Sequence, residues 1–175
     1  AGRKYISLQE LEGTEQDLLD YQLENIDHLN SVIKEVDKLI KTVTVGNRYV
    51  EILKSMVGFG EFFSRVVAVE VADIRRFRNK ENFASYCGLV PTESSSAESI
   101  HRGPVVKHAN KYMKWAFVEA AWVAVRNEPY FRDIYYNIKL RRGSNKAIVA
   151  VARKMCEVVF RMLKENRSYI SRNKM

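Results

Sequence analysis

Three adjacent serines, Ser94, Ser95 and Ser96, form the clearest group of possible nucleophiles in this chain. A serine hydroxyl attacks an electrophilic centre when a base or a metal ion activates it. The serines stand in a long segment, residues 88–110, that also holds basic or potentially basic residues able to stabilise developing negative charge. These residues are His101, Arg102, Lys107 and His108.

The same segment separates two strongly helical parts of the sequence. Pro91 and Pro104 exclude a regular helix through it. Loops longer than about 12–15 residues inside compact domains are usually functional or disordered. Composition alone favours a solvated, mobile loop, and the alternative is a loop that carries function.

Charge is unevenly distributed along the 175 residues, which carry a formal net charge of +8. Residues 1–45 contain 5 Lys or Arg and 9 Asp or Glu, whereas residues 46–175 contain 24 and 12. A basic globular part behind an acidic helical arm predicts a polyanionic partner, with nucleic acid favoured over a membrane. We therefore expect the chain to bind DNA or RNA.

Other features of the sequence exclude several classes of protein. No apolar run approaches the roughly 18 residues of a membrane span, and no signal peptide is visible. Cys87 and Cys156 occupy apolar helical positions, which predicts buried free thiols in a reducing compartment, and no cysteine has zinc-site spacing. We expect a cytoplasmic, nucleoid-associated protein without membrane contact. Because the chain begins with Ala-Gly-Arg and no initiator Met, we also expect a fragment.

The first predicted element is a helix over residues 8–44. Its apolar residues recur every seven positions, at Leu19, Ile26, Ile33 and Ile40. A heptad sustained over more than three repeats predicts coiled-coil pairing, so we expect a homo-oligomer that associates through residues 8–44. The alternative is a helix that lies on its own domain.

Two glycines, Gly58 and Gly60, separate the next pair of predicted helices. Apolar-Gly-apolar-Gly between helices is typical of a helix-hairpin-helix. There the glycines permit a tight turn, and backbone N–H groups at the start of the second helix bind a DNA phosphate. The alternative is two core helices that the glycines merely punctuate.

Basic residues gather at three later places, each of which is a possible contact to a nucleic-acid backbone. These candidates are Arg75, Arg76, Arg141, Arg142, Lys146, Arg153 and Lys154. We expect Ser144 or Asn145 to cap the helix predicted over residues 147–163, whose positive end would favour an anion. Solvated charged faces are the alternative.

The remaining patterns are also helical. Residues 110–126 are apolar nearly all round, which predicts a helix buried in the centre of the domain. No convincing strand appears, so we predict an all-α fold. We divide it into a coiled-coil helix (1–46), a compact domain with the helix-hairpin-helix and the serine loop (47–165), and a flexible tail (166–175).

Several of these pieces occur together, in order, in one known family. The chain resembles the C-terminal transposase domain of the insertion-sequence 110 type, the DEDD transposases related to pilin-gene invertases. The resemblance spans residues 50–165 and rests on Gly58-Phe59-Gly60, Asp73-Ile74-Arg75-Arg76-Phe77, Gly88-Leu89-Val90-Pro91, Ser95-Ser96, the run from Arg102 to Asn110, Trp115-Ala116, Glu119-Ala120-Ala121 and the run from Lys146 to Lys154.

This resemblance implies a function and a nucleophile. The family's serine stands at the position of Ser96, and Arg102 and Lys107 are close enough in sequence to stabilise the charge. It further implies DNA as substrate, a bridge RNA as guide, and magnesium held by a RuvC-like N-terminal domain. We expect no cofactor and no metal in residues 1–175. The carboxylates Glu70, Asp73, Glu93 and Glu98 are interpreted as solvated faces.

Two residues depart from the family pattern, since Ala97 and Ala109 each replace a glycine. Both changes stiffen a backbone that the family keeps permissive. They favour one alternative, a decayed element product that folds without chemistry. A second alternative is a helix-hairpin-helix DNA-binding module that dimerises through residues 8–44 and carries an inert loop.

Overall fold

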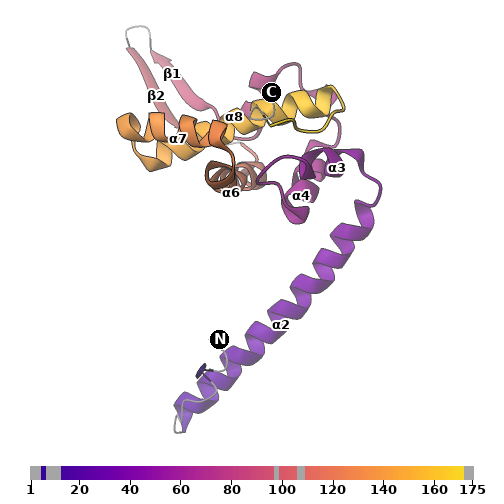
Figure 1. Ribbon diagram of the computed structural model, residues 1–175. Helices are drawn as coiled ribbons and strands as arrows, with labels where there is room; N and C mark the ends of the chain where they lie inside the picture. The colour runs from indigo at the N-terminus through magenta and orange to yellow at the C-terminus, as the bar shows by residue number, and fades with distance from the viewer. Residues whose placement is uncertain (1–4, 7–12, 97–98, 106–108, 172–175) are drawn as a thin grey trace. The chain divides into compact units, whose positions relative to one another are not determined.

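The computed structural model describes residues 5–6, 13–96, 99–105 and 109–171, with the backbone alone over 91–105. The chain divides into two compact units, residues 1–45 and residues 46–175. Figure 1 shows the elements of each unit.

The first unit is dominated by one helix, α2 (Thr14–Val43). Acidic Glu15 and Asp17 in its first turn and Lys41 in its last complement the helix dipole. None of its residues is buried, and the apolar stripe is open: Ile26 is 50% and Ile33 57% exposed. The coiled coil stays a prediction.

The second unit is a bundle of helices, which confirms the predicted all-α class for its core. The helices are α3 (Arg48–Lys54), α4 (Glu61–Val71), the short 3-10 helix η1 (Ile74–Arg76), α5 (Lys80–Tyr86), α6 (Lys111–Asn127), α7 (Pro129–Arg142) and α8 (Ser144–Lys164). Helix α8 packs against α3, η1, α5, α6 and α7, so it is the central element.

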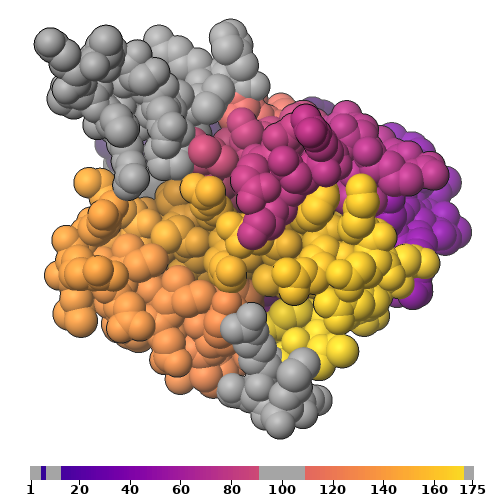
Figure 2. Space-filling view, turned by 90° about the horizontal axis from the view of Figure 1, so that it is seen from above, coloured from indigo at the N-terminus to yellow at the C-terminus, as the bar shows by residue number. Residues whose placement is uncertain are grey.

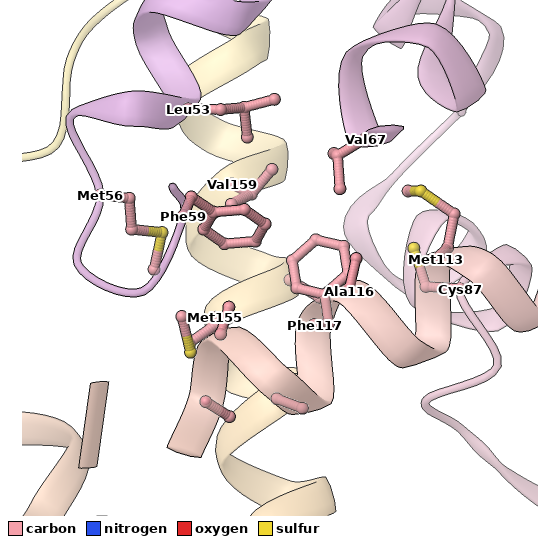
Figure 3. Packing of buried hydrophobic residues seen from close by; sticks show 14 of the residues in the cluster. Leu53, Met56, Phe59, Val67, Cys87, Met113, Ala116, Phe117, Met155 and Val159 are labelled. Carbon is pink, nitrogen blue, oxygen red and sulfur yellow. The ribbon is translucent and has the colours of Figure 1, made fainter. Parts of the chain in front are cut away.

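The core forms where the turn after α3 meets α6 and α8. Phe59 from that turn packs edge-to-face on Phe117 of α6, with ring centroids 5.3 Å apart. Figure 3 shows Met155 and Val159 of α8 beside this pair. Cys87 and Cys156 are buried and free, as predicted.

Helix α6 buries one face rather than its whole circumference. Its alanines, among them Ala116 and Ala120, are fully buried, whereas Trp115 remains 46% exposed and packs on Phe63 at 5.0 Å between ring centroids. Small side chains let neighbouring helices approach closely, and the large ring of Trp115 is left at the margin of the contact. The predicted burial all round is therefore corrected.

The cap of α5 is a residue type that the sequence favours there, whereas the cap of α8 is not a residue that the sequence predicted. Asn79 caps α5 by accepting from the Asn82 N–H at 2.8 Å, as an asparagine directly before a helix commonly does. At α8 the cap residue is Gly143, with φ of +79°, and Ser144 is already the first helical residue. Only glycine adopts this backbone conformation without strain, so it both ends α7 and begins α8.

The segment expected to be a loop contains two antiparallel strands, β1 (Pro91–Ser96) and β2 (Ser99–Val105). Ser96 pairs with Ser99 and Ser94 with His101, and the register shifts between Pro91 and Thr92. The sequence did not predict this hairpin because its residues show no alternation of apolar and polar types.

Residues 166–171 fold back on the helices, although residues 166–175 were predicted to form a flexible tail, of which residues 172–175 lie outside the described part of the chain. Arg167 N–H donates to the Met162 carbonyl at 3.0 Å and Asn166 N–H to the Leu163 carbonyl at 3.4 Å. With Asn166 at φ +51°, these bonds form a Schellman motif that reverses the chain. Beyond it, Tyr169 N–H donates to Ser55 Oγ at 2.8 Å.

Candidate nucleic-acid interface and serine loop

The two ends of the serine segment are joined by hydrogen bonds. Asn110 N–H donates to the Tyr86 carbonyl at 3.0 Å, and Asn110 Nδ2 donates to Tyr86 Oη at 3.1 Å. Asn110 Nδ2 and Tyr86 Oη also both donate to Glu70 Oε2, on α4. We call Glu70, Tyr86 and Asn110 the loop base. Glu70 is thus half-buried and paired, not the solvated carboxylate that the sequence suggested.

Asn110 has a second task, because its Oδ1 accepts from the N–H groups of Tyr112 and Met113 at 3.0 Å each. These bonds cap the start of α6. One side chain therefore fixes the first turn of α6 and the end of α5 together. The segment that carries the serines leaves and returns at a defined place.

Arg76 contacts the same region, and its predicted contact with a nucleic-acid backbone stays a prediction. Its Nη2 donates to the Glu70 carbonyl at 2.9 Å, and its guanidinium lies 4.6 Å from the ring centroid of Phe77 and 4.7 Å from that of Tyr86. Cation–π stacking of this kind holds the arginine in place. Arg76 is nevertheless exposed.

Arg75 is exposed but paired. Its guanidinium meets the Asp73 carboxylate at 2.9 Å between Nη2 and Oδ2, and this hydrogen bond lowers the pKa of Asp73 and raises that of Arg75. Asp73 also caps η1 by accepting from the Arg75 N–H. The carboxylate offsets the arginine's charge at this point of the surface.

Ser96 is the last residue of β1, directly before residues 97–98, which lie outside the described part of the chain. The backbone of Arg102 stands in β2 opposite Glu93. Lys107 lies outside the described residues, as do the side chains of Ser96 and Arg102. Their predicted roles stay predictions.

Gly58 has a packing role that the sequence did not show. It adopts φ of +97°, and a Cβ there would lie 2.2 Å from the Ala120 carbonyl oxygen on α6. Gly60 instead precedes α4 with open space around it. The helix-hairpin-helix, with its phosphate contact, stays a prediction.

The start of α4 carries a negative charge of its own. Glu61 is contacted by Lys54, at 3.0 Å, and by Arg65. The hydrogen bonds from Lys54 and then Arg65 lower the pKa of the Glu61 carboxyl, and the bond to Glu61 raises that of Lys54. A phosphate that approaches this helix end therefore meets a carboxylate that already has cationic partners.

The remaining predicted cations lie on two parts of the α7–α8 surface. Arg141, Arg142 and Lys146 are exposed around the junction at Gly143. Arg153 and Lys154 lie farther along α8 beside Glu157, where the Lys154 Nζ to Glu157 Oε2 distance is 3.2 Å. Lys80 of α5 also contacts Glu157, at 3.8 Å. No local pattern in the sequence indicates this long-range partner.

Comparison with known proteins decides the family. Residues 50–136 match the profile of the Transposase IS116/IS110/IS902 family. The chain belongs to this family. That stretch of the transposase-family chain includes the loop base, Ser96, and most of α7, and the match confirms the resemblance drawn from the sequence.

Curated relatives support this family assignment. The chain is 34% identical over 123 residues to an insertion element IS110 protein of Streptomyces coelicolor, covering 69% of this chain and 30% of that protein. It is 24% identical to the transposase for insertion sequence element IS1111A of Coxiella burnetii, covering 80% and 40%. It is 25% identical to the pilin gene-inverting protein of Moraxella bovis, covering 87% and 49%. It thus spans about a third to a half of these relatives.

The described residues contain neither a metal-binding group nor a membrane-spanning helix. Among the described residues, no three His, Cys, Asp or Glu side chains gather in a group that could hold a metal ion. Within that same part of the transposase-family chain, no helix is long and apolar enough to cross a bilayer.

Proposed function

We propose that this chain is the nucleic-acid-binding and nucleophile-bearing part of a DNA transposase or recombinase, with Ser96 as nucleophile. The observation that carries the proposal is the loop base, where Tyr86, Asn110 and Glu70 join the two ends of the serine segment. A reactive group on a long segment needs such a rigid support, because small displacements of a nucleophile greatly slow a reaction.

The proposed reaction begins with attack of the Ser96 hydroxyl oxygen on the phosphorus of a DNA phosphodiester. A bond from the serine oxygen to phosphorus forms and the bond to one deoxyribose oxygen breaks. The serine proton passes to a base, and the leaving oxygen gains a proton. Since the phosphoserine ester retains the energy of the original bond, a hydroxyl of another strand can reverse the step without a nucleotide cofactor.

Arg102 and Lys107 are proposed to stabilise negative charge on the phosphoryl oxygens, as cations beside a transferred phosphoryl group do. Magnesium, where a transposase binds it, would assist by activating the hydroxyl and neutralising the phosphate. The described residues of this chain do not form a site for it. We propose that a RuvC-like domain, which the family resemblance implies, binds the magnesium.

DNA is the proposed substrate, and a guide RNA is the proposed second nucleic acid. The positive charge of residues 46–175, with 24 Lys or Arg against 12 Asp or Glu, supports both. Such binding falls steeply with salt, by about 0.9 in log K per unit of log salt for each duplex phosphate neutralised. Arg141→Ala with Arg142→Ala should reduce that slope without unfolding the chain, because both residues are exposed.

The decisive experiment uses a full-length transposase that contains this sequence, together with its RNA. Ser96→Ala should abolish the covalent protein–DNA linkage and recombination while DNA binding stays within twofold of wild type. Ser94→Ala and Ser95→Ala are matched controls, because each removes one hydroxyl from the same strand, and both should keep substantial activity. An adduct mapped by mass spectrometry to another serine would reassign the nucleophile, and no adduct at any serine would refute it.

A further inference from the structure

A basic cleft lies between α8 and the returning tail, at a place that none of the predicted contacts except Lys154 touches. It has a volume of about 490 Å³, within the range of roughly 300–1,000 Å³ typical of sites for small ligands. Its floor is the exposed face of α8, and residues 165–170 form one wall. In Figure 2 the end of α8 and the tail, in yellow, lie beside the α5 region, in magenta.

The wall of this cleft is fixed rather than frayed. The Schellman motif at Asn166 turns the tail back, and the Arg48 Nε to Asn166 Oδ1 hydrogen bond of 3.2 Å ties it to α3. Farther along, Ser171 Oγ donates to the buried Glu128 at 2.8 Å. Because both ends of the wall are anchored, the cleft exists before any ligand arrives.

Positive charge dominates the lining. Five cations, Lys80, Lys154, Arg161, Lys164 and Arg167, face two carboxylates, Glu157 and Glu165. Glu157 already has Lys80 and Lys154 as partners, and Glu165 has Arg167. Among the described residues, Arg161 forms no ion pair, and its side chain is exposed. The cleft therefore offers uncompensated cations to an anion.

Aromatic rings complete the lining. Tyr130, Phe160 and Tyr169 are all half-buried at its edge, and Lys164 Nζ lies 5.8 Å from the ring centroid of Phe160. Cations beside aromatic surfaces are the elements with which proteins hold single strands, since the cations meet phosphates and the rings stack on exposed bases. A duplex hides its base faces inside the stack and would not use the rings.

We propose that this cleft binds a nucleotide unit of a single-stranded nucleic acid, with Arg161 and Lys164 on the phosphate and the aromatic edge against the base. The inference rests on the proposed nucleic-acid function and locates one contact surface for it. RNA and DNA strands share this chemistry, and the experiment separates them.

The test measures fluorescence anisotropy of labelled oligouridylate, oligothymidylate and a mixed-sequence duplex, each of about 12 nucleotides per strand. Arg161→Ala with Lys164→Ala should weaken both single-strand complexes about tenfold and lower the salt slope by about 1.4, at roughly 0.7 per lost phosphate contact. Duplex affinity should change less than twofold. Lys34→Ala with Lys38→Ala on α2 removes the same charge outside the cleft and should leave single-strand binding within twofold.

Cross-linking gives an independent measurement. Strands with 4-thiouridine or bromodeoxyuridine should cross-link to Tyr130, Phe160 or Tyr169, and the tighter of the two strands identifies RNA or DNA as the natural source. Equal affinity would mean that the cleft recognises only the shared phosphate and base. Unchanged single-strand affinity in the folded Arg161/Lys164 variant, or cross-links confined to other residues, would overturn the proposal.

Different results would refute the proposed cleft and the proposed transposase function. A wild-type chain that binds the duplex but no single strand refutes the cleft and leaves the transposase function standing. Loss of covalent linkage in Ser96→Ala, measured as above, does not depend on the cleft at all.

Discussion

Asn110 and Tyr86 are joined twice, by a backbone hydrogen bond of 3.0 Å and a side-chain hydrogen bond of 3.1 Å, although 24 residues separate them. Between them runs the whole segment that carries Ser94, Ser95 and Ser96. Since Asn110 also caps α6, a change at this residue affects a helix start and the loop base together.

Replacing Asn110 by aspartate separates these two tasks. Aspartate keeps the oxygen that caps α6 but loses the Nδ2 donor and places a carboxylate against Glu70. We expect Asn110→Asp to destabilise the second unit by about 1–3 kcal/mol, because it leaves a half-buried polar contact unmet. Thermal unfolding followed by circular dichroism measures this change.

A second change, Glu70→Gln, completes a double-mutant cycle with Asn110→Asp. The glutamine amide can donate to the carboxylate introduced at position 110. The double variant should therefore recover part of the lost stability, with a coupling energy of about 0.5–3 kcal/mol. Strictly additive effects would mean that Glu70 and Asn110 do not interact in solution.

Gly58 should not tolerate a side chain. Gly58→Ala combines a left-handed backbone, at φ +97°, with a Cβ at 2.2 Å from the Ala120 oxygen, and backbone atoms cannot rotate away. We expect a loss of about 2–4 kcal/mol in unfolding free energy. Gly60→Ala is the matched control, because its Cβ meets no atom within 4 Å, and it should cost less than about 1 kcal/mol. Equal midpoints in urea would contradict the close approach.

Helix α2 should associate with a second copy of itself. Its apolar stripe includes Leu29, 59% exposed, and Val36, 47% exposed, besides Ile26 and Ile33. Replacing Ile26 and Ile33 by aspartate should give a monomer in light scattering, because charges in a coiled-coil seam oppose pairing. His28→Asp with Ser31→Asp adds the same charges off the stripe and should stay associated. A wild-type chain already monomeric at high concentration would exclude the idea.

Cys156 should resist thiol reagents in the folded chain. Burial first, and then its hydrogen bond with Cys87, raises the pKa of the Cys156 thiol well above its ordinary value of 9.0. At a pH below the pKa, each unit by which the pKa rises lowers the thiolate fraction about tenfold. Labelling by a disulfide reagent at pH 8 should therefore be slow until guanidinium unfolds the chain.

The same shift affects stability at alkaline pH. A thiol whose folded pKa is raised favours the folded state below the unfolded pKa, and this stability is lost as pH rises toward the folded pKa. We expect Cys156→Ser, which cannot ionise there, to flatten the fall in unfolding midpoint between about pH 8 and 10. An unchanged pH profile would show that the thiol contributes nothing to it.

Much of the fold follows from the sequence, because local patterns determine helices. The apolar face of α8, with Val151, Met155 and Val159 buried, repeats at helical spacing. Asn79 is a helix cap for reasons that lie within one turn of chain. The order of the family motifs was likewise visible without a structure. Hydrogen bonds and periodicity over a few residues carry the helix and cap signals.

The tertiary structure alone decided which residues contact distant parts of the chain. Arg76 and Arg141 look alike in the sequence and both are exposed, yet Arg76 stacks on Tyr86 while Arg141 donates to a carbonyl of its own helix, α7. Gly58 differs from Gly60 in its left-handed backbone and in the backbone of α6 that passes beside it. These distinctions arise from contacts between residues far apart in the chain. Side-chain type and local spacing do not encode such contacts, since packing of the whole core selects them.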